Sequence, residues 1–107
     1  MKVLLDECLD QRLRLFFPEH ECQSAAYSGF SGLTNGALLA AAEAAGFDVL
    51  ITTDRSMPHQ QNLSSCRIAI MILCAQTNRL EELKLLIPDA TAALRQITAG
   101  AIVSIGN

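Results

Sequence analysis

Two apolar runs in the sequence each stop at acidic side chains whose oxygens suit a hard divalent cation. The run "VLL" near the N-terminus is followed directly by Asp6 and Glu7, and the run in "DVLITTDRS" stops at Asp54. Neighbouring carboxylates repel each other, by roughly 1 kcal/mol at 4 Å in water and about 4 kcal/mol at a partly screened site. A cation between them removes this cost, and oxygen ligands favour Mg²⁺ or Mn²⁺. We therefore expect Asp6, Asp54 and Glu7 to be metal ligands and catalytic residues.

The acids must be positioned by the strands that precede them. Continuously apolar segments are typical of parallel strands that are buried on both faces. Helices are predicted between the strands, where apolar residues recur at helical spacing. The first has its apolar face at residues 9–17 and ends at Pro18, and the second stops at Gly46. Asn78 with Glu81 forms a capping box for the third, which Pro88 should break or kink. The expected strands cover residues 2–5, 21–25, 49–53, 68–73 and 101–105. This alternation predicts a three-layer α/β/α fold with a mainly parallel sheet of four to five strands.

The connections predict the strand order 2-1-3-4, with the last strand at an edge. In this order the second strand lies on one side of the first strand and the third strand lies on the other. The strand order therefore reverses between the first and third strands, and ligands usually bind there, beyond the carboxyl ends of the strands. Asp6 and Asp54 follow those two strands, so we expect them one strand spacing apart, about 4.8 Å. Ordinary roles remain an alternative, since acids after strands often cap the next helix and Arg55 is a candidate counter-charge. Asp10 is better placed than Asp6 to cap the first helix.

Composition limits the class of protein. A chain of 107 residues with 50% hydrophobic and 18% charged residues predicts a single globular domain. No run reaches the roughly 18–20 apolar residues of a membrane span, and the start of the chain does not resemble a secretory signal, so we expect a cytoplasmic protein without membrane contact. Four cysteines without CxxC spacing predict reduced, mostly buried thiols.

Three segments carry a resemblance to a known family. "MKVLLDECL", "GLTNGALLAAAEAAGFDVLITTDRSM" and "HQQNL" resemble the PIN-like domains of unknown function that are grouped with VapC-type toxin ribonucleases of bacterial toxin–antitoxin systems. The resemblance runs from Lys2 to about Ile72. It implies a PIN-like fold and a ribonuclease that depends on Mg²⁺ or Mn²⁺, with Asp6 and Asp54 as metal ligands and Glu7 as the acid that often follows the first.

The resemblance also implies partners: an RNA substrate, an antitoxin protein and a second copy of the chain in a homodimer. Further polar residues near the predicted site are candidates for substrate contacts, although hydrogen bonding within a surface loop explains those after residue 57 as well. These candidates are Asn35, Arg55, His59 and Asn62. The chain departs from its relatives at Ala37, where they usually carry an acid, and it lacks the further acid that many of these nucleases carry after the third strand.

Two other classes of function stay open. The missing acids favour a degenerate, non-catalytic PIN-like binding module that partners an antitoxin or another protein. A phosphoryl-accepting receiver domain also has paired acids after the first strand and Asp after the third. It needs a lysine at the end of the last strand, but the only lysines are Lys2 and Lys84. The net charge of −3 counts against tight binding of nucleic acid without help from a partner.

Overall fold

Five short strands, all parallel, form one sheet in the described ranges of the chain. The computed structural model describes residues 1–33, 35–57 and 67–106. The strands lie in the order β2-β1-β3-β4-β5, which confirms the predicted order and the edge position of the last strand. Their bounds are β1 Lys2–Leu5, β2 Glu21–Ser24, β3 Val49–Thr52, β4 Ala69–Cys74 and β5 Ile102–Gly106.

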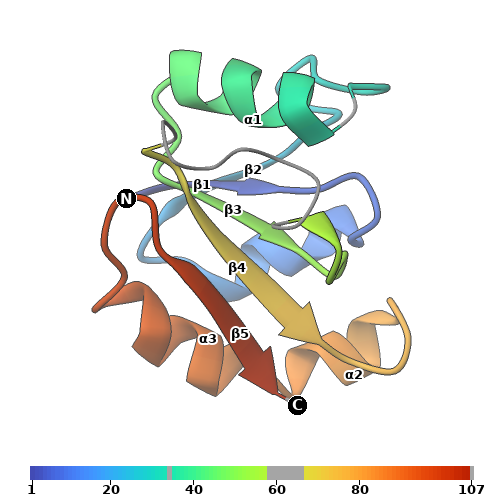
Figure 1. Cartoon of the computed structure of the whole chain (residues 1–107). Helices are drawn as coiled ribbons and strands as arrows, with labels where there is room; N and C mark the ends of the chain where they lie inside the picture. Colours follow the sequence, from blue (N-terminus) through green and yellow to red (C-terminus); the bar gives the residue numbers. More distant parts are fainter. Residues whose placement is uncertain (34, 58–66, 107) are drawn as a thin grey trace.

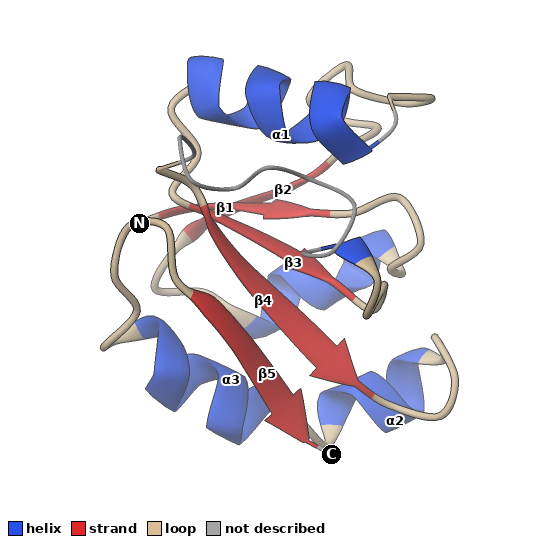
Figure 2. Ribbon diagram, in the orientation of Figure 1, coloured by secondary structure: helices blue, strands red, loops and turns tan. Residues whose placement is uncertain are grey.

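Helices cover both faces of the sheet, which gives the predicted three layers (Figures 1 and 2). One face carries α1, and the other carries the 3-10 helix η1 together with α2 and α3. Each face packs on its own apolar cluster, and successive side chains of β1 alternate between the two clusters. Val3 and Leu5 pack on the η1 side, and Leu4 packs on the α1 side. The helices are η1 Gln11–Phe16, α1 Asn35–Ala44, α2 Leu80–Lys84 and α3 Ile87–Leu94.

The first helix is shorter than its apolar spacing predicts, and it is of the 3-10 kind. Asp10 caps it as predicted, because its carboxylate accepts a hydrogen bond from the Arg12 N–H. The Leu13 N–H then bonds the Asp10 carbonyl oxygen, a three-residue step that fits a 3-10 turn. Leu13 and Phe17 are buried, so the predicted apolar face still packs on the sheet.

Helix α1 ends at Ala44, and Gly46 forms the turn after it, where the sequence predicts the helix to stop. Gly46 has φ +85°, and its N–H bonds the Glu43 carbonyl oxygen while the Phe47 N–H bonds the Ala42 carbonyl oxygen. This pair of bonds is a Schellman motif, which needs the left-handed conformation that glycine adopts without strain. Phe47 is thereby turned into the core beside α1.

The last helices begin differently from the sequence prediction. The expected capping box of Asn78 with Glu81 is wrong: α2 begins after Arg79, and no side chain caps it. Instead, Glu82 reaches back to the Thr77 N–H, at 3.2 Å from Oε2, which satisfies a donor one turn earlier. The helical segment breaks near Pro88 as predicted: α2 ends at Lys84, and Pro88 lies in the first turn of α3, where its missing N–H costs nothing.

Strand β5 has an unusual composition for an edge strand. Its sequence "IVSIG" has no charged side chain, and Ile102 is 48% exposed.

Within the described ranges, no helix is both long enough and apolar enough to cross a membrane.

Candidate functional site

The carboxyl ends of β1 and β3 meet at the point where the strand order reverses. From β1 the chain goes to β2 on one side, and it later returns to β3 on the other side of β1. Both pairs are parallel, so the residues that follow β1 and β3 emerge at the same edge of the sheet. We call this edge, with Asp6, Glu7 and Asp54, the carboxyl edge. It is where α/β sheets usually bind ligands.

Both carboxylate oxygens of Asp6 are held by neighbouring groups. The Asp6 N–H extends the ladder to the Ile51 carbonyl oxygen at 3.0 Å, which brings Thr52 alongside Asp6. The buried Thr52 hydroxyl donates to Asp6 Oδ2 at 2.7 Å, and the Glu7 N–H donates to Asp6 Oδ1 at 2.8 Å. The orientation of this carboxylate is thus fixed by the strand that lies next to it.

Asp54 lies two residues beyond the position expected for it. Thr52, rather than Asp54, is in register with Asp6, so the direct opposition expected from the sequence is replaced by a hydroxyl that links the two acids. Thr52 Oγ1 accepts the Asp54 N–H at 3.0 Å while donating to Asp6. Asp54 Oδ1 in turn accepts from Ser56 N–H at 2.9 Å and Ser56 Oγ at 2.6 Å. The separation of the two carboxylates stays a prediction.

Glu7 has a structural contact that the sequence did not predict. Its Oε1 accepts the Gly32 N–H at 2.6 Å, across 25 residues of chain. Gly32 has φ +82°, a conformation that favours glycine, and this turn aims its N–H at the carboxylate. Glu7 therefore fastens the loop after β2 to the carboxyl edge with one of its two oxygens.

The exposed thiol of Cys8 lies beside Asp6, in contrast to the prediction of mostly buried cysteines. Its sulfur is 3.3 Å from Thr53 Oγ1 and 3.7 Å from Asp6 Oδ2. Cys22 is half-buried, and burial raises the pKa of its thiol to about 12, so it stays protonated at neutral pH. Sequence reasoning passed over Thr52 and Cys8. Their positions, two residues before one acid and two after the other, were the available signal.

The other predicted site residues are only partly placed. Arg55 is exposed, and no carboxylate of the described residues lies within ion-pair distance of it, so it is not the counter-charge considered above. Asn35 begins α1, but its side chain is not described. His59 and Asn62 lie outside the described residues.

A shallow cavity of about 250 Å³ opens beside the acids. Asp6, Glu7 and Ser24 line it together with Leu9, Gln11 and Ala26. The neighbouring acid Asp10 forms an ion pair with Arg12, whose guanidinium balances its charge and lowers the pKa of its carboxyl group to about 2. The acids nearest to the cavity, in contrast, are held by N–H, hydroxyl and thiol donors.

The described residues contain no cluster of three or more His, Cys, Asp or Glu side chains arranged to hold a metal ion. The acids that the carboxyl edge offers to an ion are thus few, with Asp6 and Asp54 as the two expected direct ligands. That number fits Mg²⁺, which usually keeps several waters and binds one or two carboxylates together with substrate phosphates. Among the described residues, no donor reaches the second oxygens of Glu7 and Asp54, which leaves them open for such contacts.

No family model, curated protein or solved structure matches the chain. Membership of the PIN-like domains therefore stays a prediction that depends on the quoted segments.

Proposed function

We propose that the protein is a ribonuclease that depends on Mg²⁺ or Mn²⁺, with its active site at the carboxyl edge. The observation that supports this most is the Thr52 hydroxyl, which orients Asp6 and holds the Asp54 backbone at the same time. Two acids fixed through one buried group at a strand-order reversal form the kind of preorganised oxygen site that a hard cation requires.

Each residue has a separate role in this proposal. Asp6 and Asp54 bind the ion directly, and Glu7 contributes its free oxygen or contacts a water on the ion. When bound, the ion polarises a phosphodiester oxygen and lowers the pKa of a water for in-line attack. The small number of carboxylates favours one ion rather than two. Arg55, Asn35, His59 and Asn62 remain candidates for contacts with the RNA.

A non-catalytic binding module is the second candidate, and two contacts favour it. Glu7 fastens Gly32, and Asp54 holds the turn at Ser56, so both acids already have local structural uses. In this case the carboxyl edge has lost catalysis, and the domain acts by binding an antitoxin, another protein or a second copy of the chain. The two candidates differ in whether a cation binds at the carboxyl edge.

A receiver domain is a weaker fit. The sheet order agrees with that class. However, Lys2 begins β1 at the opposite edge, and the Lys84 ammonium lies 5.2 Å from the centre of the Phe16 ring. Among the described residues, neither lysine follows β5, where a receiver would need one.

A metal titration with matched variants tests the proposal. Thermal unfolding and cleavage of single-stranded RNA are followed against Mn²⁺ and Mg²⁺ for wild type, Asp6→Asn, Asp54→Asn and Asp48→Asn. Asp48 is the control because it is an acid at the opposite, amino edge of the same strands. Mn²⁺ at about 100 times its Kd should stabilise wild type by about 2.7 kcal/mol.

The variants decide between the candidates. We expect Asp48→Asn to keep both the stabilisation and the cleavage, and Asp6→Asn to lose both. A wild-type protein with neither metal-dependent stabilisation nor cleavage would leave the binding module. Stabilisation without cleavage would identify a degenerate nuclease that retains its ion.

A further inference from the structure

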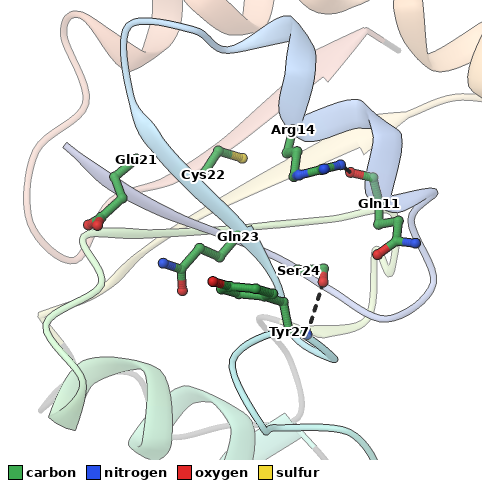
Figure 3. Close-up of a pocket in the computed structure, with 7 residues that line it drawn as sticks. All are labelled: Gln11, Arg14, Glu21, Cys22, Gln23, Ser24 and Tyr27. Atoms are coloured by element: carbon green, nitrogen blue, oxygen red, sulfur yellow. Dashed lines mark hydrogen bonds between the residues drawn. The ribbon is translucent and has the colours of Figure 1, made fainter.

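A second, larger cavity lies along the outer side of edge strand β2, and its lining is suited to a nucleotide (Figure 3). Its volume is about 380 Å³, within the range of small-molecule sites. Strand β2 forms its floor, η1 contributes Gln11 and Arg14, and Tyr27 lies on the other side, from the loop that follows β2.

Tyr27 offers an exposed aromatic ring on a fixed backbone. The residue is 79% exposed, which is unusual for an aromatic side chain that serves only packing. Its backbone is nevertheless held, because the Tyr27 N–H donates to Ser24 Oγ at 3.1 Å. Phe30, in the same loop, packs edge-to-face on Phe47, with 6.3 Å between the ring centroids, and so belongs to the core. Stacking of a base on an exposed aromatic ring contributes roughly 1–3 kcal/mol and does not depend on which base it is.

Arg14 supplies a positive charge without a carboxylate partner. Its Nη1 donates to the Gln11 carbonyl oxygen at 3.1 Å, which orients the guanidinium, while the remaining donors are left for a ligand. In the described ranges, no carboxylate lies within ion-pair distance of it. A guanidinium held in this way is suited to a phosphate oxygen.

Two amide side chains and one acidic side chain make the two ends of the cavity chemically different. Gln23 Oε1 accepts from Ser28 Oγ at 3.1 Å, so its amide N–H groups remain available to the edge of a base. Glu21 lines the cavity at the start of β2 and repels phosphate, while Gln11 and Ser24 line the other end, which the close-up shows clearly (Figure 3). A nucleotide phosphate would therefore lie away from Glu21.

The far end of this cavity leads to the carboxyl edge. Gln11 and Ser24 line both the β2 cavity and the smaller cavity that contains Asp6 and Glu7. Ser24 is in register with Leu5, the residue before Asp6. Adjacent strands are about 4.8 Å apart, so the two cavities are neighbours, with Tyr27 at the first and Asp6 at the second.

We infer that the β2 cavity binds one nucleotide of a single-stranded RNA, with its base on the Tyr27 ring and its phosphate on the Arg14 guanidinium. The neighbouring phosphate of the strand then lies toward Asp6. This inference rests on the proposed nuclease function for the direction of the strand, and the binding itself depends only on the β2 cavity.

Binding of a short fluorescein-labelled single-stranded RNA, measured by anisotropy in EDTA to prevent cleavage, tests the inference. We expect Tyr27→Ala to weaken binding by about tenfold or more and Tyr27→Phe to retain it, because phenylalanine still stacks. Leu85→Ala is the matched control, since Leu85 is 78% exposed on another part of the surface, and it should bind as wild type does. Arg14→Gln should weaken binding and reduce the salt slope by about 0.7, the value for one phosphate of a single strand.

The outcomes separate this inference from the proposed function. A wild-type protein that does not bind the RNA, or that binds it equally well after Tyr27→Ala, overturns the inference even if Mn²⁺ stabilises the protein. Tyr27-dependent binding without any effect of Mn²⁺ supports the β2 cavity and overturns the nuclease. Tyr27→Ala should unfold at the same temperature as wild type without metal, which shows that the variant is folded.

Discussion

The two ends of the neighbouring strands β1 and β3 both carry acidic side chains, but only the amino end also carries a lysine. At the amino edge, Asp48 Oδ2 accepts the Lys2 N–H at 2.8 Å, and the Lys2 ammonium bonds the Ala45 carbonyl oxygen at 2.8 Å and lies 4.4 Å from the centre of the Phe47 ring. At the carboxyl edge, Asp6, Glu7 and Asp54 are held by neutral N–H, hydroxyl and thiol donors.

This difference identifies the carboxyl edge as the place where acidic side chains have no lysine beside them and can interact with a positively charged ligand. A lysine lies at the amino edge, so that edge has its own positive charge. In the described ranges, no ion pair involves Asp48 or any of the three acids of the carboxyl edge, so the two edges differ in the nearby lysine and not in a salt bridge. Uncompensated charge at a strand-order reversal is a feature of functional sites rather than of stability, because repulsion between acids is unfavourable for folding.

The largest effect is expected from giving the carboxyl edge a lysine of its own. Thr53→Lys places an ammonium group among the three acids, beside the contact of Thr53 with Cys8. We expect it to abolish the Mn²⁺-dependent rise in the midpoint of thermal unfolding and to raise the metal-free stability by about 1 kcal/mol. Thr53→Gln, which removes the hydroxyl without adding charge, is the control and should keep the Mn²⁺ effect. A lysine variant that Mn²⁺ still stabilises would contradict the comparison.

The second effect concerns the hydroxyl between the two acids. Thr52→Val removes the donor to Asp6 and the acceptor of the Asp54 N–H, both in a fully buried position. We expect Mn²⁺ affinity to fall by about 10–100-fold and the free energy of unfolding to fall by about 1–3 kcal/mol. Calorimetric titration and urea unfolding measure the two quantities, and Thr52→Ser should restore the affinity. Unchanged affinity in Thr52→Val would exclude a positioning role for this hydroxyl.

The third prediction tests the amino edge. Lys2→Met keeps an apolar side chain over Phe47 but removes the ammonium that bonds the Ala45 carbonyl oxygen. We expect the free energy of unfolding to fall by about 1 kcal/mol, with no change in the Mn²⁺ response. Urea unfolding with and without Mn²⁺ measures both. A loss of the Mn²⁺ response in this variant would mean that the two edges are not independent.

The smallest effect is expected at Asp10, an acid near the carboxyl edge that forms an ion pair with Arg12. Because Arg12 lowers the pKa of Asp10 from 3.8 to about 2, this pair contributes stability above pH 4 that is lost as the pH falls through 2. Asp10→Asn can still cap η1 but lacks the charge. The urea midpoint of wild type should therefore exceed that of the variant slightly at pH 6, and the two should converge near pH 2. A difference that is constant with pH would contradict the pairing.

The layers and the strand order could be predicted from the sequence because they depend on local signals. Continuous apolar runs identified the buried strands, Asp10 and Gly46 marked the ends of helices, and Pro88 separated two of them. The 3-10 character of η1 was not predictable from spacing, since Leu13 and Phe17 face the sheet in either kind of helix.

The candidate site was only partly predictable, because its contacts join distant parts of the chain. The bond from Gly32 N–H to Glu7 depends on how a glycine-rich loop folds back, and a backbone donor leaves no mark in the sequence. The position of Asp54 depends on register, and a shift of two residues along β3 made Thr52 the neighbour of Asp6. The β2 cavity is lined by side chains from η1, β2 and the loop after β2, and no sequence motif predicts such a combination.

The pairing of β1 with β3 also has a consequence for how the polypeptide is made. Asp6 and Thr52 are in contact although they are 46 positions apart. During synthesis, β1 must wait for more than 40 further residues before its central neighbour β3 exists. Until then its apolar side chains have only β2 beside them, so a nascent chain stalled at this length is the form most exposed to chaperones and to aggregation.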